Sequence, residues 1–291
     1  SLHRNIKALD LAQAYINATL NEDVWLELPD GEIVKANKPI YGLKQSAMEW
    51  YKELRGTILA EGWGSSAYNE CLYYRESNDE LIAILILTTY VDDTLFTGDF
   101  TEEIARMRKR LLEVHERGEL GTPDKLVGVW ITIRKDGITL DQELNAQGIV
   151  MAGMGSLDVR KTTTPLDPGM DLSARRHDEE ELDTTRFPYA SILGKLMFLA
   201  GMTRPDVANS VRELGRRAAS PCLRHWRGLQ HVLRYVTSTL DVRIHYGRGP
   251  DNDEQNDRQI LVGYADSDWG TDPETRRSVT GYLLLVNNSP V

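Results

Sequence analysis

The sequence predicts an α+β protein in three parts, with antiparallel hairpins in its first half and mainly helices in its second. Two observations lead to this prediction. Strand-like runs in the first half are joined by turns and do not alternate regularly with helices. Two acidic stretches, residues 177–183 and 250–257, have the composition of solvated linkers. These two stretches divide the chain into three parts.

Local signals place the elements of the first part. Ser46 and Glu49 have the spacing of a capping box, so a helix is expected from Ser46, with Gly62 as its stop. Residues 81–97 read as a strand, a turn and a strand. The next helix is expected near Thr101, because acidic residues follow in its first turn and apolar residues recur at helical spacing.

The rest of the chain changes character. Residues 126–141 predict a second hairpin with its turn at residues 135–137. Helices are then expected from Pro188 and Pro205, and residues 220–221 read as the N-cap and first residue of another helix. Two strand-like runs after the second acidic stretch suggest that a further domain begins there.

Composition narrows the class of protein. The 291 residues are 41% hydrophobic, which is enough for one large or two moderate cores, and no apolar run is long enough to span a bilayer. A soluble intracellular protein is expected, with two packing cysteines and no disulfide framework. The net charge of −10 opposes general binding to nucleic acid, yet Arg204–Arg248 holds nine arginines and no lysine. This basic segment is either a binding surface or an ordinary solvated face.

The stretch "ILILTTYVDDTLFTG" ends a buried-strand pattern in Asp92 and Asp93. Aspartate is common in tight turns, so a plain hairpin explains the pair without any function. The alternative is a site for two divalent ions, which needs a third carboxylate from another strand. Asp10, in "KALDLAQAYINATL", is a candidate, although the same residue would suit a helix N-cap.

The order of these motifs favours the metal site. The acid Asp10, then "YGLKQSAMEWY", "YVDD" and "LVGVW", resembles the motif series of reverse transcriptases of copia-type LTR retrotransposons. The resemblance covers almost the whole chain. It implies a right-hand polymerase palm with partial fingers over residues 1–150, a helical thumb and connection over residues 151–257, and the start of an RNase H fold over residues 258–291. Asp10, Asp92 and Asp93 match the catalytic aspartates. Asp10 and Asp92 would bridge two Mg²⁺ ions, or Mn²⁺ in their place, and Asp93 would join them through the bend of the turn.

The resemblance also implies roles around the nucleotide. Tyr15 matches the aromatic residue that excludes a ribose 2′-hydroxyl, although a tyrosine on a helix can equally pack in the core. Gly42 matches the glycine that lets the backbone approach the template base pair, and it also suits a plain turn. Gln45 follows in the same motif, while the proline usual in the family two residues later is Ala47 here.

Further matches concern the primer and the second half. Gly128 and Trp130 fall on the family's primer-gripping hairpin, and Lys125 is the candidate general acid for pyrophosphate. Asp266, in "GYADSDWG", matches the first acid of RNase H, with Asp268 as a neighbour and a solvated strand end as the alternative. Four arginines are expected to face the template–primer duplex: Arg216, Arg217, Arg224 and Arg227.

The resemblance implies an RNA-directed DNA polymerase whose partners are an RNA template, a DNA primer, deoxynucleoside triphosphates and the integrase and protease of its Pol polyprotein. No membrane is involved, and the expected location is a cytoplasmic virus-like particle or the nucleus. The fingers strands that clamp the triphosphate would precede Ser1, and RNase H would continue past Val291, so this chain alone is expected to be feebly active. The alternative is an inactive or co-opted remnant that keeps a nucleic-acid-binding surface.

Overall fold

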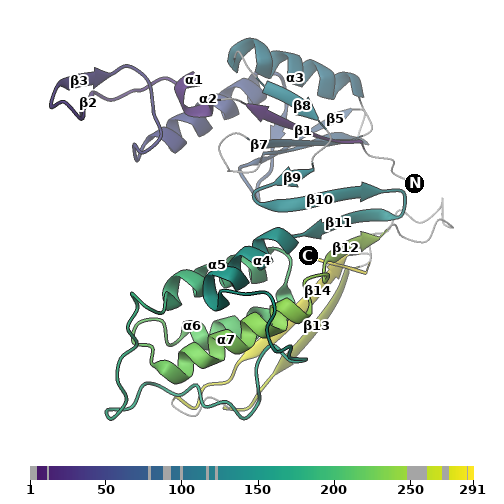
Figure 1. Ribbon diagram of the computed structural model, residues 1–291. Coiled ribbons are helices and arrows are strands. Elements are labelled where there is room, and N and C mark those ends of the chain that lie inside the picture. The colour runs from purple at the N-terminus through teal and green to yellow at the C-terminus, as the bar shows by residue number, and fades with distance from the viewer. Residues whose placement is uncertain are drawn as a thin grey trace. The chain divides into compact units, whose positions relative to one another are not determined.

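Hairpins and helices are combined in two units of the chain, Ser1–Val127 and Gly128–Val291. The computed structural model in Figure 1 shows antiparallel sheets and helices in each, which confirms the predicted α+β class. The part boundaries at residues 150 and 257 stay a prediction. The structure describes residues 5–11, 13–77, 80–87, 93–98, 101–115, 118–121, 124–247, 261–270, 275–286 and 288–291.

The first unit is organised around a six-stranded sheet with the strand order β4-β5-β6-β7-β1-β8. All five neighbouring pairs are antiparallel. The predicted strands within residues 81–97 are present as β6 and β7. The strands are β1 (Asn5–Leu11), β4 (Gly64–Ser65), β5 (Leu72–Ser77), β6 (Glu80–Leu87), β7 (Asp93–Gly98) and β8 (Gly118–Gly121).

Helices cover the core of this unit. α1 (Ala14–Asn17) packs against both α2 (Ser46–Ala60) and α3 (Thr101–His115), and α3 also packs against β1 and β7. The predicted helices at Ser46 and Thr101 are thereby confirmed. Their buried side chains meet those of the sheet in one cluster that includes Leu9, Trp50, Phe96 and Met107. A separate hairpin, β2 (Val24–Glu27) with β3 (Ile33–Ala36), and the short strand β9 (Lys125–Leu126) complete the unit.

The capping box predicted at Ser46 is wrong. The N-cap of α2 is Gln45, and no side chain caps it. The hydroxyl of Ser46 instead donates a hydrogen bond of 2.6 Å to the carbonyl of Ile40. Glu49 binds Lys52 at 3.0 Å, so its carboxylate is used outside the cap. Both side chains therefore make local contacts other than a cap, Ser46 with the preceding turn and Glu49 along the helix surface.

His115, the last residue of α3, is buried in this core against the edge of Trp50, with ring centroids 4.8 Å apart. Neither ring nitrogen has a hydrogen-bond partner among the described residues. Burial, with a smaller contribution from Arg110, lowers the pKa of His115 from 6.5 to about 4. The folded state therefore holds this imidazole neutral.

We expect the first unit to lose stability as the pH falls from 6.5 towards 4, because in that range the unfolded chain binds a proton that the folded one excludes. The loss from this residue should reach about 3 kcal/mol once both states are protonated. His115→Phe keeps a ring against Trp50 and should flatten the pH dependence, which urea unfolding at several pH values would measure. An unchanged slope would mean that folding does not lower the pKa of His115.

The second unit combines a helical core with two small sheets. β10, β11 and β12 are adjacent and antiparallel, and the predicted turn at residues 135–137 joins the first two. β13 and β14 form the hairpin expected after residue 258, with β15 on its far side. The strands are β10 (Val129–Arg134), β11 (Gly137–Asp141), β12 (Ile244–Gly247), β13 (Leu261–Ser267), β14 (Thr280–Val286) and β15 (Ser289–Pro290).

Four helices form the core of the second unit through side chains that include Ile149, Leu196, Leu229 and Leu233. The predicted helices from Pro188 and Pro205 are confirmed, the second beginning as a 3-10 turn with Pro205 at its first position. No helix in the described part of the chain is long and apolar enough to cross a membrane. The helices are α4 (Glu143–Met154), α5 (Tyr189–Met202), η1 (Pro205–Val207), α6 (Ala208–Gly215) and α7 (Leu223–Ser238).

The start predicted for the last helix is corrected by the structure. α7 begins at Leu223, with Cys222 as N-cap, and not at residues 220–221. The backbone N–H of Cys222 donates to Nδ1 of His225 at 3.1 Å. Nε2 of His225 lies 2.9 Å from the carbonyl of Ser173, so this nitrogen carries the proton. The imidazole of His225 thus replaces the expected serine cap, and its other nitrogen is held by the carbonyl of Ser173.

Candidate functional site

The backbones of two predicted catalytic positions lie side by side in the first unit. β1 and β7 are antiparallel neighbours, and their register sets Asp10 directly opposite Asp93. Antiparallel partners have Cα atoms about 4.5–5.5 Å apart. On its other side Asp10 is opposite Glu119 of β8, an acid for which no sequence motif gave a signal. Asp92 lies outside the described residues.

The side of the sheet on which Asp93 lies follows from its neighbours. Thr94 and Phe96 are buried towards the helices, and Leu9, the register partner of Thr94, is buried as well. Because side chains alternate along a strand, Asp93 belongs to the opposite face of β7, where it is half-buried. Among the described residues, no three His, Cys, Asp or Glu side chains are grouped closely enough to hold a metal ion.

Tyr15 and the "YGLKQ" motif come together next to α1. The rings of Tyr15 and Tyr41 are in contact, with centroids 4.5 Å apart and planes tilted by 49°. Gly42 has a φ of +103°, and no atom lies within 4 Å of the place that a Cβ would take. The left-handed backbone thus requires glycine, and the space above it is open. Gln45 is half-buried at the N-cap of α2. Tyr41 is a contact of Tyr15 that sequence reasoning missed.

The predicted primer-grip residues lie at an unusual turn. Val127 has a φ of +49° and Gly128 one of +76°. A β-branched residue rarely takes a positive φ, and such strain costs about 1–3 kcal/mol. A Cβ on Gly128 would lie 3.8 Å from the ring of Phe198. Trp130 is half-buried in β10 opposite Asp141, and Lys125 is exposed in β9.

α5 presents an exposed apolar face that includes this phenylalanine. Met197 is 57% exposed, Phe198 39% and Met202 38%. On the same side, Gly194 and Gly201 have open space where a Cβ would project. An exposed apolar stripe with open glycines is typical of a surface that another molecule approaches closely. In the sequence, this face could have been found from the two glycines, which are seven residues apart and so lie on one side of a helix.

Arg224 is held inside the chain by a dense set of contacts. Its Nε and Nη2 bind the two carboxylate oxygens of Glu179 at 2.7 and 2.9 Å. Nη1 pairs with Asp171 at 3.3 Å and donates to the carbonyl of Ser173, while Nη2 donates to that of Ala174. The hydrogen bonds from Arg224 lower the pKa of Glu179 to about 2. The stretch 177–183, expected to be a solvated linker, is therefore anchored at Glu179.

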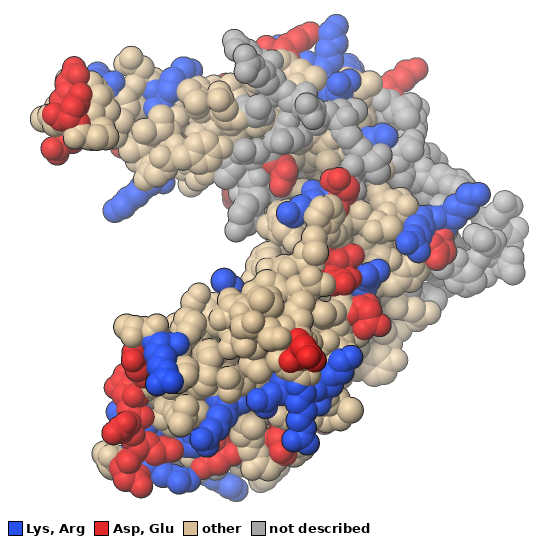
Figure 2. Space-filling model, in the orientation of Figure 1, with Lys and Arg blue, Asp and Glu red and all other residues tan. Residues whose placement is uncertain are grey.

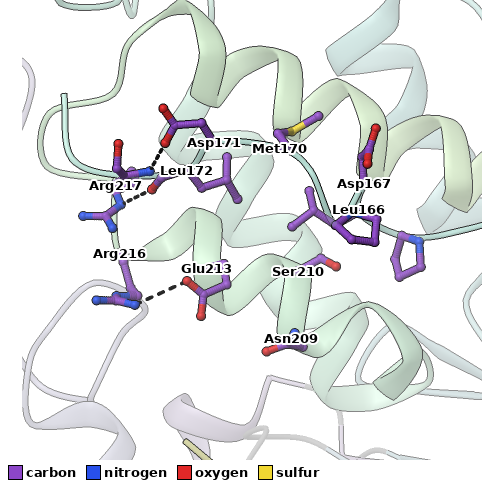
Figure 3. A pocket seen from close by; sticks show the side chains of 13 residues that line it. Leu166, Asp167, Met170, Asp171, Leu172, Asn209, Ser210, Glu213, Arg216 and Arg217 are labelled. Carbon is purple, nitrogen blue, oxygen red and sulfur yellow. Dashed lines mark hydrogen bonds and ion pairs between the residues drawn. The ribbon is translucent and has the colours of Figure 1, made fainter. Parts of the chain in front are cut away.

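Arg216 and Arg217 line a hollow of about 560 Å³ between α6 and the segment 165–173, shown in Figure 3. Arg217 donates to the carbonyl of Leu172 at 2.7 Å. Arg216 pairs with Glu213 at 3.4 Å. The lining thus carries both charges, and its arginines already have partners within the chain. Arg227, the last of the four predicted arginines, lies exposed on α7.

The two acids of "GYADSDWG" differ in their surroundings. Asp266 is exposed in β13 opposite Gly281, and its carboxylate accepts the N–H of Ser267 at 2.9 Å. Asp268 accepts the N–H of Val279 at 2.7 Å, so its carboxylate fastens the β13–β14 hairpin. Asp266 is thus the more accessible of the two.

Comparison with known proteins identifies the class. Residues 2–168 match the family described as reverse transcriptase (RNA-dependent DNA polymerase). This is more than half of the chain, and the protein belongs to the reverse transcriptase family.

Three of the relatives are transposon proteins. The chain is 29% identical, over its whole length, to the retrovirus-related Pol polyprotein from transposon TNT 1-94 of Nicotiana tabacum, of which it covers 22%. It is 29% identical over 98% of its length to that from transposon RE2 of Arabidopsis thaliana, covering 19%. The putative transposon Ty5-1 protein of Saccharomyces cerevisiae is 27% identical over 97% of the chain and is covered to 90%. The chain spans about a fifth of the two plant polyproteins. The predicted resemblance to copia-type elements is thereby confirmed.

Proposed function

We propose that this chain is the RNA-directed DNA polymerase region of a copia-type retrotransposon Pol polyprotein. The observation that carries the proposal is the register of β1 and β7, which sets Asp10 opposite Asp93 in a chain of the reverse transcriptase family. Like charges on directly opposite residues of neighbouring strands destabilise a sheet. A cation between them would reverse that cost.

Asp10, Asp92 and Asp93 would hold two Mg²⁺ ions, or Mn²⁺ in their place. Carboxylate oxygens are the ligands that hard cations prefer, and the pairing of β1 with β7 agrees with this donor set. Bound there, the metal would supply activation of the primer 3′-hydroxyl and stabilisation of charge on the α-phosphate. The chain's own contribution is to fix the acids on paired strands, so that the metal ligands need no reorganisation during the reaction.

The Tyr15 side of α1 would face the incoming sugar. Contact with Tyr41 braces the Tyr15 ring, and the open space at Gly42 leaves the backbone accessible to a base pair. Gln45 would contribute from the N-cap of α2. A braced ring is a better steric gate than a mobile one, because its position does not yield to a 2′-hydroxyl.

Replacing Tyr15 with Val should raise the incorporation of ribonucleotides relative to deoxynucleotides by about tenfold or more, since the gate would be shortened. Single-nucleotide extension with each triphosphate measures the ratio. Tyr15→Phe is the matched control, because it keeps the ring and its contact with Tyr41 and should leave the ratio unchanged. An equal ratio in all three proteins would make Tyr15 a packing residue only.

The primer would be held by the Gly128 turn together with Trp130. The exposed apolar face of α5 beside this turn suits the sugar edges of a duplex groove, and the glycines allow close approach. Lys125 would protonate the pyrophosphate. Asp266 would belong to an RNase H site. Of the arginines expected on the duplex, Arg224 supports the fold, so we propose that the contact rests on the remaining three: Arg216, Arg217 and Arg227.

Synthesis on poly(rA) primed with oligo(dT) tests the proposal. DNA made with Mg²⁺ and stopped by EDTA would support it, and the absence of synthesis by the whole Pol polyprotein under these conditions would contradict it. The proposed partners are the RNA template, the DNA primer, deoxynucleoside triphosphates and the integrase and protease of the polyprotein. The proposed location is a cytoplasmic virus-like particle or the nucleus.

A further inference from the structure

The solvent face of α7 carries a row of basic side chains. Arg227, His231 and Arg234 follow one another at intervals of four and three residues, so they share one side of the helix. The opposite side, with Leu229 and Leu233, is buried in the core. Arg227 is exposed, and Arg234 is half-buried.

A strap segment, residues 160–174, runs antiparallel to α7 along its whole length. The N–H of Thr162 donates to the hydroxyl of Ser238 in the last turn of the helix, at 3.0 Å. Nε2 of His231 donates to the carbonyl of Thr164 at 3.0 Å. Near the start of α7, Arg224 binds the carbonyl of Ala174. The strap therefore has a fixed path beside the helix.

This path brings two more cations to the row. Arg160 and Lys161 come directly before Thr162 and are both exposed. Together with Arg227 and Arg234 they form what we name the α7 patch. Figure 2 shows Lys and Arg side chains in a band over α7.

The charge of the α7 patch is not neutralised within the described part of the chain. None of its four Lys and Arg side chains forms an ion pair or hydrogen bond with a described residue, whereas Arg224 of the same helix pairs with Glu179 and Asp171. The acids nearest to the patch in sequence, Asp158 and Asp241, are exposed and form no ion pair with it either. Like charges gathered on one surface repel one another, and an anionic partner would remove that cost.

The dimensions and composition of the patch select the partner. From Arg227 to Arg234 the helix rises about 10 Å, which equals the axial length of about three phosphates of one strand of a duplex. The exposed residues of α7 and the strap include no Phe, Tyr or Trp. Single strands are usually held by stacking on aromatic rings, so the patch suits the backbone of a duplex better.

We propose that the α7 patch binds the phosphate backbone of an RNA–DNA hybrid duplex. The proposal rests on the polymerase function, which produces such a hybrid, and it identifies Arg160, Lys161 and Arg234 as contacts that the sequence motifs did not indicate. The contact is independent of base sequence, since it reads charge alone. It would secure the duplex on the surface of α7 without taking part in the chemistry.

The test is the salt dependence of hybrid binding by the whole chain, measured by fluorescence anisotropy in EDTA. Arg227→Gln with Arg234→Gln removes two phosphate contacts, and so does Arg160→Gln with Lys161→Gln. Each double variant should flatten the plot of log affinity against log salt by about 1.8, because each contact on duplex DNA contributes about 0.9. Between 50 and 200 mM salt the wild type should then lose about tenfold more affinity than either variant.

Matched variants distinguish the loss of patch contacts from a change in the net charge of the protein. Arg212→Gln with Arg243→Gln makes the same charge change at arginines that pair with Glu213 and Glu143, and it should leave the slope as in the wild type. Arg227→Lys with Arg234→Lys keeps the charge and should also keep the slope. Equal slopes in the wild type and both patch variants would overturn the proposal.

Two competitors distinguish other partners. If polyglutamate displaced the hybrid as readily as unlabelled hybrid does, the proposal of a duplex partner would be overturned, and the partner would be an acidic protein surface. If the patch variants flattened the salt dependence of binding to single-stranded RNA as much as that of binding to the hybrid, a duplex would not be the preferred partner. Because the assay contains no metal and no triphosphate, a failure of hybrid binding can be distinguished from a failure of the polymerase proposal in primer extension.

Discussion

Asp10→Asn should reduce Mg²⁺-dependent primer extension by about a thousandfold or more. The amide keeps the shape of the side chain but offers one neutral oxygen, so the negative charge that a divalent ion needs is lost beside Asp93. Removing one preorganised electrostatic group from an active site typically costs a hundred- to a thousandfold, and a ligand shared by two ions should lie at the upper end. Extension of labelled oligo(dT) on poly(rA) by the Pol polyprotein measures the effect.

The interpretation of this variant depends on two controls. Asp178→Asn makes the same charge change at an exposed residue of the second unit and should leave extension unchanged. Binding of the hybrid by Asp10→Asn should be as strong as in the wild type or stronger, because a negative charge near the phosphates has been removed. Near-normal extension by Asp10→Asn would show that the pairing of β1 and β7 serves the fold alone.

Gly137→Ala should destabilise the second unit by about 3 kcal/mol or more. Gly137 begins β11 with a φ of +153°, which residues with a Cβ rarely adopt. A Cβ would also lie 2.2 Å from the carbonyl oxygen of Tyr246 on the neighbouring strand β12. That obstacle is backbone, so relief requires β11 and β12 to separate. The midpoint of urea unfolding, followed by circular dichroism, should fall accordingly.

Gly148→Ala is the matched control in the same unit. Gly148 lies within α4, has an ordinary φ, and has nothing within 4 Å of the place that a Cβ would take. Alanine there should raise stability by about 0.5–1 kcal/mol, because glycine in a helix loses more backbone freedom on folding. If both variants shifted the midpoint in the same direction by the same amount, the close approach of β11 and β12 at Gly137 would be refuted.

Local patterns were sufficient for the elements and the family. Apolar residues at helical spacing placed the helix at Thr101, as the burial of Met107 and Leu111 confirms, and proline placed the turn at Pro205. The ordered motifs around Asp10 indicated a copia-type reverse transcriptase, which the comparisons confirm. These properties follow from neighbours along the chain, because periodicity and turn chemistry act over a few residues.

Long-range contacts decided what those patterns left open. Ser46 and Ser220 had suitable positions for caps, but their hydroxyls are used elsewhere. That of Ser46 donates to the carbonyl of Ile40, six residues earlier, and that of Ser220 accepts a hydrogen bond from Arg175, 45 residues earlier. The sequence also left open which arginines form ion pairs within the chain. Arg224 pairs with Glu179, while Arg227, one helical turn later, is exposed to solvent. Both are arginines of the same helix, so composition does not distinguish the paired residue from the exposed one. The path of residues 171–179 beside α7 decides the matter, because Asp171 and Glu179 both pair with Arg224 and an ion pair depends on distance in space.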